Sequence, residues 1–188
     1  VTPLRGNRSG AVVAHTNITE LKEMEEELHT LSITDSLTGL YNRRGFFTLA
    51  EKQIKIARRM NRTLLLFSID LDGLKEINDT FGHQEGDLAL VAAANILNAT
   101  FRESDIIARI GGDEFAIIQT GASEDSIGII TARLKENLEH HNAIGKRRYG
   151  LSMSMGTSWF YPENPRSIDE LLARADLMMY EQKRRKVK

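Results

Sequence analysis

The chain has 188 residues, of which 41% are hydrophobic and 27% are charged, as in a globular protein large enough to bury a sizeable core. Its formal net charge is −1, so we expect no nucleic acid partner and no membrane contact by this fragment. It contains no cysteine, which excludes disulfides and thiolate metal sites. It also contains no apolar run long enough to cross a bilayer. We expect a cytoplasmic protein, with a membrane anchor or sensor conceivable upstream because the chain does not begin with methionine.

The first 32 residues are expected to lie outside the main domain. Residues 1–16 have the pattern of a loop and a short strand, which we interpret as the remnant of an upstream domain. A linker helix is expected over 17–32, with Asn17 as its N-cap and Glu20 three residues later. Its apolar residues follow the spacing of a coiled-coil seam: Leu21, Met24, Leu28 and Leu31. The alternative is an amphipathic helix packed on its own domain.

The main domain is expected to cover residues 33–188. A turn-rich segment precedes a helix over about 44–60, and the continuous apolar run 63–69 predicts a central strand buried on both faces. The later patterns predict helices over 72–81 and 87–99 with a break at 82–86, a hairpin around 111–114, a helix over 126–142, a strand over 151–157 and a helix over 168–183. This order predicts an α/β (α+β) fold with a mixed, mostly antiparallel central sheet and helices on its faces.

Two acidic motifs end apolar runs. The tip of the predicted hairpin places Gly111 and Gly112 before Asp113 and Glu114, and glycine lets a backbone approach a ligand closely. Asp70 ends the predicted central strand. Acids at either place alone are commonly solvated, but together they would converge if the hairpin lies beside that strand. Carboxylates without histidine make a hard-oxygen site suited to Mg²⁺ or Mn²⁺.

A phosphate site is predicted just after the central strand. Gly73 and Leu74 open a helix whose free backbone N–H groups attract phosphate, and Lys75 can reach the same phosphates. Nearby, Asn78 and Asp87 offer an amide and a carboxylate that can read a guanine edge. The alternative for Asp87 is a helix N-cap.

Five motifs in order resemble the GGDEF-domain diguanylate cyclases, over about residues 31–183. They are residues 35–44, Asp70-Leu71-Asp72 with Lys75 and Asn78-Asp79, Phe81-Gly82-His83 with Gly86-Asp87, Gly111–Phe115, and Ala175-Asp176 with Tyr180. Asn17–Glu20 and the charged helix after them resemble the tail of a PAS sensor domain and its signalling linker.

The resemblance implies condensation of two GTP molecules into cyclic di-GMP with release of two pyrophosphates, across a homodimer in which each protomer holds one GTP. It implies Mg²⁺ or Mn²⁺ held by Asp70, the carbonyl of Leu71 and Asp113, with Glu114 as a further ligand or beside the attacking hydroxyl. Asp113 and Glu114 are thus the candidate catalytic residues. The implied GTP-binding residues are Gly73, Leu74, Lys75, Asn78, Asp87, Gly111, Gly112 and Lys183.

The resemblance also implies inhibition by the cyclic product. Arg102 and Asp105 match the family's inhibitory Arg-x-x-Asp pattern, and Arg133 lies where a second arginine often contributes. The alternative is a surface ion pair before a strand.

The end of the chain departs from the family pattern. The family continues after the last lysine with glycine, arginine and asparagine, whereas this chain ends in 183–188 as Lys-Arg-Arg-Lys-Val-Lys. Arg184, Arg185 or Lys186 can replace the missing phosphate-binding arginine, or the cluster is a solvated tail. Two other functions stay open: a catalytically silent module that binds GTP or cyclic di-GMP, and an enzyme that makes an adenine or mixed dinucleotide.

Overall fold

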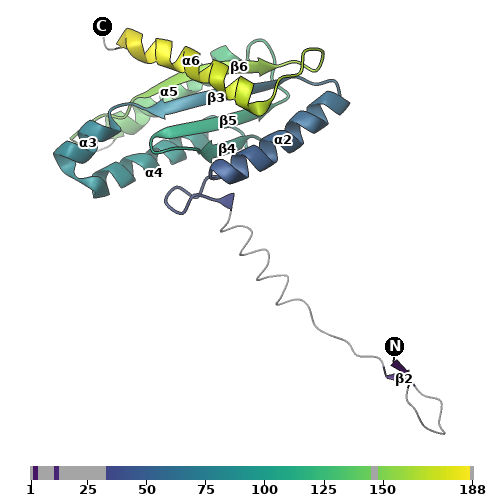
Figure 1. Cartoon of the computed structure of the whole chain (residues 1–188). Helices are drawn as coiled ribbons and strands as arrows, with labels where there is room; N and C mark the ends of the chain where they lie inside the picture. The colour runs from purple at the N-terminus through teal and green to yellow at the C-terminus, as the bar shows by residue number, and fades with distance from the viewer. Residues whose placement is uncertain (1, 4–10, 13–32, 145–147, 187–188) are drawn as a thin grey trace. The chain divides into compact units, whose positions relative to one another are not determined.

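The computed structural model describes residues 2–3, 11–12, 33–144 and 148–186, and the chain divides into the units Val1–Leu31 and Ser32–Lys188 (Figure 1). In the first unit, β1 (Thr2–Pro3) pairs antiparallel with β2 (Ala11–Val12). The expected linker helix over 17–32 lies outside the described residues. No helix in the described part of the chain is long and apolar enough to span a membrane.

The second unit is built on a four-stranded sheet. Its strands are β3 (Leu64–Leu71), β4 (Ile106–Arg109), β5 (Glu114–Thr120) and β6 (Met153–Phe160), in the spatial order β4-β5-β3-β6. All three pairings between these strands are antiparallel, and an isolated parallel bridge joins Tyr41 to Ala108 of β4, which confirms the mostly antiparallel sheet expected. All residues of β3 are buried, because it has a strand on each side and helices on both faces. This position explains its continuous apolar sequence.

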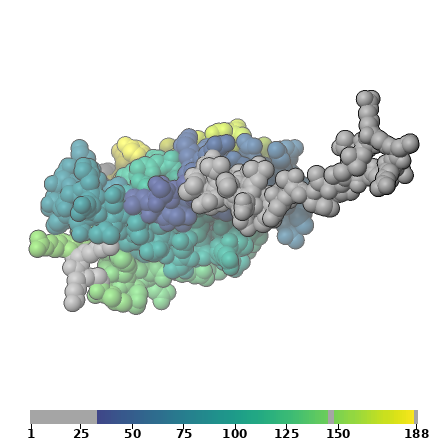
Figure 2. Space-filling model, turned by 90° about the horizontal axis from the view of Figure 1, so that it is seen from below, coloured from purple at the N-terminus to yellow at the C-terminus, as the bar shows by residue number. Residues whose placement is uncertain are grey.

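Helices cover both faces of the sheet (Figure 1). On one face, α2 (Arg43–Arg59) and α6 (Ile168–Lys186) pack on a core cluster that includes Phe46, Leu66 and Leu171. On the other, α4 (His83–Thr100) and α5 (Ser126–Ile144) pack on a cluster that includes Phe67 and Leu97. Figure 2 shows the α4 and α5 side in teal and green. The short helix α3 (Leu74–Phe81) links β3 to α4.

The helix boundaries follow local signals at two places. Asn42 caps α2 by accepting a hydrogen bond from the N–H of Gly45, and Ser167 and Glu170 form a reciprocal capping box before α6. The predicted break at 82–86 is wrong in length. Only Gly82, with φ of 90°, separates α3 from α4, so Asp87 lies inside α4 and is not an N-cap.

The last helix lies very close to the sheet at Gly156 in β6. A Cβ atom at this position would overlap the carbonyl oxygen of Ala175 and the amide nitrogen of Met179, both in the backbone of α6. On the neighbouring strand, the hydroxyl of Ser68 donates a hydrogen bond to Asp176 of α6. Glycine and serine therefore let α6 dock closely, which positions the side chains of its last turns.

Candidate active site

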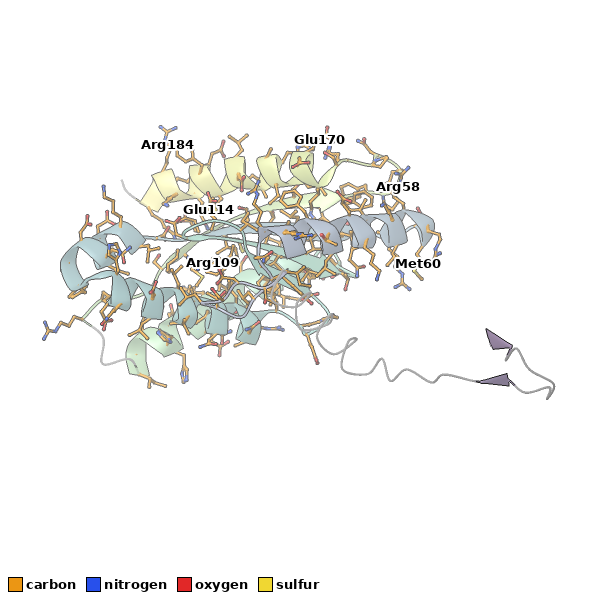
Figure 3. All side chains as sticks on the ribbon, turned by 60° about the horizontal axis from the view of Figure 1, so that its bottom comes forward. Arg58, Met60, Arg109, Glu114, Glu170 and Arg184 are labelled. Carbon is orange, nitrogen blue, oxygen red and sulfur yellow. The ribbon has the colours of Figure 1, made fainter. Side chains whose placement is uncertain are left out.

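The acids of the two motifs meet at one end of the sheet. Asp70, near the end of β3, is in register with Glu114, the first residue of β5. The N–H of Leu71 donates to the carbonyl oxygen of Asp113 at 2.9 Å. The hairpin therefore lies beside β3 at the point where the central strand ends. In Figure 3, Arg109 and Glu114 lie together at this end, far from Met60 after α2.

Arg109 stabilises the hairpin turn. Its guanidinium donates from Nε and Nη2 to the carbonyl oxygen of Gly112 at 3.1 and 2.9 Å. Its Nη1 atom lies 3.3 Å from Asp35 Oδ1, in an ion pair whose side chains are only 16% and 21% exposed. Neither side chain is among the site residues predicted from the sequence.

Asp35 in turn organises the segment before α2. Its Oδ1 accepts hydrogen bonds from the N–H and the hydroxyl of Thr38 at 2.9 and 2.6 Å. Burial alone would raise the pKa of Asp35, but these hydrogen bonds and the charge of Arg109 together lower it. The Asp-x-x-Thr spacing is a recognisable local signal for such a turn, whereas the partner at Arg109 has none in the sequence.

The acids at the end of the sheet perturb one another. Burial is the main cause that raises the pKa of Asp70, and the charges of Asp113 and Asp72 raise it further against the opposing effect of Lys183. The pKa of Glu114 is also raised, first by burial and then by the charges of Asp176, Asp113 and Asp70. Such crowding of carboxylates favours a bound cation.

Two lysines of α6 partly compensate this negative charge. Lys183 Nζ lies 2.6 Å from Asp70 Oδ1, and Lys186 Nζ lies 2.8 Å from Asp72 Oδ2. Burial would lower the pKa of Lys183, but Asp70 and the nearby Asp113 and Asp72 raise it. Lys183 is among the residues predicted from the sequence to bind GTP, and Lys186 is one of the three candidates to replace the missing arginine.

Asp72 is held by further hydrogen bonds. The hydroxyls of Ser152 and Ser154 donate to its Oδ2 and Oδ1, each at 2.7 Å. Burial would raise the pKa of Asp72, but Lys186 and the two serines lower it. The two serines lie about eighty residues after Asp72, and no pattern in the sequence predicts that they contact it.

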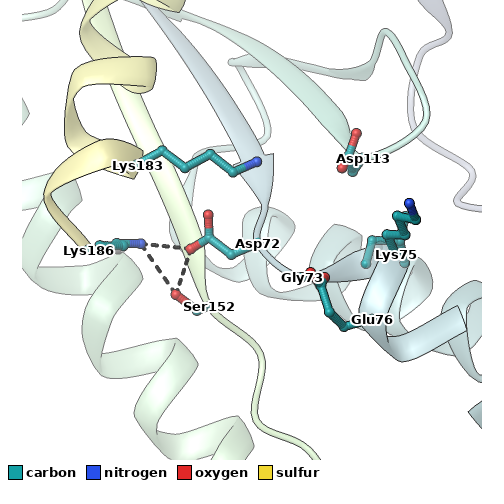
Figure 4. A pocket seen from close by; sticks show the side chains of 9 residues that line it. Asp72, Gly73, Lys75, Glu76, Asp113, Ser152, Lys183 and Lys186 are labelled. Atoms are coloured by element: carbon teal, nitrogen blue, oxygen red, sulfur yellow. Dashed lines mark hydrogen bonds and ion pairs between the residues drawn. The ribbon is translucent and has the colours of Figure 1, made fainter. Parts of the chain in front are cut away.

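A cavity of about 480 Å³ opens beside these groups (Figure 4). In Figure 4, Lys183 and Lys186 reach it from α6, and Lys75 and Asp113 stand on the other side. Its walls come from the residues just after β3, the start of α3, the hairpin, the residue before β6, and α6: Asp72, Gly73, Leu74, Lys75, Glu76, Asp113, Ser152, Lys183 and Lys186. The residues predicted to bind phosphate thus lie around one space.

The start of α3 lines this cavity and has no side-chain cap. Gly73 is the N-cap of the helix, with φ of 73°, and it has no side chain to satisfy the first N–H groups. Its left-handed conformation is one that glycine adopts without strain. Backbone donors and three lysines around one cavity suit a polyphosphate.

The predicted guanine-reading pair lies apart from the cavity lining. Asn78 is half-buried in α3, and its side chain lies against Gly86 of α4, where a Cβ atom would overlap it. Asp87, the next residue, is exposed. The close approach of α3 and α4 at Gly86 therefore places Asn78 against the residue that precedes Asp87, although neither side chain lines the cavity.

The residues of the predicted inhibitory site have different surroundings. Asp105 is buried, and its carboxylate accepts hydrogen bonds from the backbone N–H groups of Arg102 and Thr120 at 3.0 and 3.4 Å. The side chain of Arg102 is exposed, while Arg133 donates to the carbonyl oxygen of Thr100 at 2.9 Å. The alternative of an ion pair between Arg102 and Asp105 is wrong, because that carboxylate stabilises the turn before β4.

The acids suit a cation that keeps other ligands. In the described part of the chain, no group of three or more acidic, histidine or cysteine side chains is close enough to hold a metal ion alone. Magnesium is usually held by one or two carboxylates, with water and phosphate oxygens completing its shell. Asp70 and Glu114 are cross-strand neighbours beside the Asp113 turn, so one or two of these carboxylates can serve a cation of that kind.

Comparison with known proteins points to one family. The family model described as "Diguanylate cyclase, GGDEF domain" matches residues 32–188. The chain is 38% identical over 174 residues to the probable diguanylate cyclase DgcC of Escherichia coli K12, covering 92% of this chain and 46% of that protein. It is 34% identical over 172 residues to the diguanylate cyclase DgcP of the same strain, covering 91% and 50%.

A solved structure with a similar fold combines a coiled coil with a GGDEF domain. The coiled coil and GGDEF domain of DgcB from Caulobacter crescentus, in complex with c-di-GMP, matches with a TM-score of 0.79 and 28% identity, covering 89% of this chain and 88% of that one. The chain spans about half the length of the curated relatives it matches.

Proposed function

Since the chain belongs to the GGDEF-domain diguanylate cyclase family, we propose that it condenses two GTP molecules into cyclic di-GMP and two pyrophosphates. One observation carries this proposal: Asp70 and Glu114 are cross-strand neighbours next to the Asp113 turn, beside a cavity that three lysines line. This arrangement joins cation-binding acids to a polyphosphate-binding surface.

The cyclase domain extends over residues 33–188 in this proposal. Residues 1–16 are the remnant of a PAS-like sensor domain, and residues 17–32 form the linker helix that carries its signal. We place the protein in the cytoplasm, where GTP is available.

Each residue has a role in binding one GTP. Lys75 and Lys183 hold the β- and γ-phosphates together with the backbone of Gly73 and Leu74. Gly111 and Gly112 let the nucleotide lie against the hairpin. Asn78 and Asp87 read the guanine edge, and their position outside the cavity lining leaves the cavity to the phosphates.

Asp70, the Leu71 carbonyl and Asp113 would hold Mg²⁺ or Mn²⁺, with Glu114 as a further ligand or beside the attacking hydroxyl. The divalent cation would neutralise charge on the α-phosphate and the leaving pyrophosphate and ease deprotonation of the 3′-hydroxyl. Arg109 holds the carbonyl of Gly112 and so orients the turn that carries Asp113.

The reaction requires two protomers. The 3′-hydroxyl of each GTP attacks the α-phosphorus of the other, two phosphodiester bonds form, and two pyrophosphates leave. One protomer holds one nucleotide, so a homodimer must bring two cavities face to face. Cyclic di-GMP then inhibits the enzyme by binding at Arg102, Asp105 and Arg133, with the exposed Arg102 as the main contact.

The experiment is product analysis with GTP and Mg²⁺ at several protein concentrations. We expect cyclic di-GMP, a steep rise of specific activity with concentration, no product from ATP, and no product from Asp113→Ala. A chain that binds GTP at high concentration but forms no cyclic product would be a silent binding module, and equal use of ATP would indicate an adenine or mixed product. Either result would overturn the proposal.

A further inference from the structure

Asp72 connects the end of the central strand to β6 and α6 (Figure 4). It directly follows β3, and its backbone N–H donates to the carbonyl oxygen of Ser152 at 2.9 Å. Its carboxylate accepts hydrogen bonds from the hydroxyls of Ser152 and Ser154, each at 2.7 Å, and from the ammonium of Lys186 at 2.8 Å. The backbone and the side chain of one residue are therefore both tied to residues 152–154.

These contacts hold the carboxylate in one place. Ser154 is 0% exposed, so the hydroxyl that holds Oδ1 belongs to the close-packed interior of the sheet. The Asp72 side chain is 19% exposed, and its two oxygens together accept three hydrogen bonds from the protein. Three donors occupy most of the roughly four acceptor positions of a carboxylate, so Asp72 serves as an anchor rather than as a cation ligand.

The anchored residue leads directly into the wall of the cavity. Gly73 and Leu74 follow Asp72, line the cavity and begin α3. Gly73 has no side chain to cap the helix, and glycine is the residue with the most backbone freedom. On its helical side the turn is held by the N–H of the buried Ile77, which donates to the carbonyl oxygen of Gly73 at 3.0 Å. Asp72 fixes the other side of the turn, before the glycine.

We propose that Asp72 is a positioning residue of the phosphate site, which holds the Gly73–Leu74 turn so that the backbone N–H groups of α3 face the outer phosphates of the nucleoside triphosphate. The inference rests on the proposed function. The anchor acts through the turn and does not need to contact the nucleotide. A carboxylate at a polyphosphate site repels its ligand, so removal of an acid without a positioning role would tighten binding. The sign of the change on removing Asp72 therefore distinguishes the two roles.

The test measures binding of 3′-deoxy-GTP with Mg²⁺, since this nucleotide has all three phosphates but lacks the hydroxyl needed for condensation. Asp72→Asn keeps the shape of the side chain and removes its charge, but an amide nitrogen cannot accept hydrogen bonds. We expect Asp72→Asn to weaken 3′-deoxy-GTP binding about tenfold, because the turn loses its anchor, and GMP binding less than about twofold. In turnover, the KM for GTP should rise about tenfold, while kcat at saturating GTP changes less than about threefold.

Glu76→Gln is the matched control, because it removes the same charge from an exposed acid of the same cavity. It should bind 3′-deoxy-GTP as tightly as the unmodified chain or more tightly. Ser154→Ala is the second test variant, because it removes the buried hydroxyl that holds Oδ1 and leaves the charge of Asp72 in place. It should weaken 3′-deoxy-GTP binding about threefold.

A thermal melt of each variant tests whether it folds, and Ser154→Ala keeps the test decisive if Asp72→Asn does not fold. The inference is overturned if Asp72→Asn binds 3′-deoxy-GTP as tightly as Glu76→Gln does, if it weakens GMP binding equally, or if it lowers kcat without raising the KM. If the unmodified chain makes cyclic product in any of these cases, the proposed function stands and only the inference fails. If the unmodified chain neither binds 3′-deoxy-GTP nor makes product, both fail.

Discussion

Lys183 Nζ lies 2.6 Å from Asp70 Oδ1, and this contact joins the end of the last helix to the end of the central strand. The two side chains differ in exposure, at 38% for Lys183 and 10% for Asp70. Loss of the lysine would leave a buried carboxylate without its cation, whereas loss of the carboxylate would leave a lysine that water can solvate. The pair is therefore asymmetric in its effect on stability.

We expect Asp70→Asn to abolish cyclic product while the melting temperature at pH 7 stays the same or rises. The folded state raises the pKa of Asp70, so its ionised form opposes folding at neutral pH, and asparagine removes that cost. Lys183→Ala is the contrasting variant and should lower the free energy of unfolding by about 1–2 kcal/mol. Calorimetry and product analysis measure both effects. Near-normal turnover by Asp70→Asn would contradict its assignment as a metal ligand.

Asp35→Asn should destabilise the protein in a pH-dependent way. The pKa of Asp35 is lower in the folded state than in the unfolded state, so its stabilising contribution is fully present above the unfolded value of about 4. This contribution is lost as the pH falls from about 4 through the lower pKa that Asp35 has in the folded state. We expect a deficit on the order of 1 kcal/mol at pH 7 that disappears in acid. Denaturant unfolding at pH 7 and pH 3 checks this, with Glu51→Gln, an exposed acid on α2, as the control. A deficit that does not change with pH would exclude the ion pair with Arg109 as its cause.

Arg102→Ala should affect inhibition by the product, whereas Asp105→Ala should affect the stability of the fold. The exposed Arg102 side chain is expected to contact the product, so its loss should raise the inhibitory concentration of cyclic di-GMP at least tenfold with an unchanged melting temperature. The Asp105 carboxylate accepts two backbone hydrogen bonds, so its loss should cost about 1–3 kcal/mol of stability. Initial rates with added product and thermal melts measure the two effects. Unchanged inhibition in Arg102→Ala would remove the proposed inhibitory site.

Gly156→Ala should displace α6. The added Cβ would overlap backbone atoms of Ala175 and Met179, which cannot rotate aside, so we expect a loss of about 1–3 kcal/mol and reduced activity as the lysines of α6 move. Gly128→Ala is the matched control, because a Cβ there has no neighbour within 4 Å and lies in α5. It should be neutral or stabilising by up to about 1 kcal/mol. Equal stability of the two variants would show that α6 does not need its close contact with β6.

Local patterns predicted most of the elements. The apolar run before Asp70 correctly indicated a central strand, and the Gly111-Gly112 turn correctly indicated a hairpin, because both signals arise from neighbouring residues. The start of α4 was wrong by four residues. Glycine and polar residues at 82–86 suggested a break, but only Gly82 interrupts the helices. Packing against α3 stabilises the first turn of α4 more than the weak helix propensity of Gly86 opposes it.

The amino-acid sequence by itself determined which acids, lysines and glycines were available and that the strand and the hairpin both end in carboxylates, since those features depend on order along the chain. Only the tertiary structure decided the pairings: Asp70 with Lys183, Asp72 with Lys186, and Asp35 with Arg109. The physical reason is that each pair joins residues more than seventy positions apart, so their contact depends on how closely α6 and the hairpin dock on β3 and its surroundings. That docking depends on side-chain volume, and no periodicity in the chain encodes it.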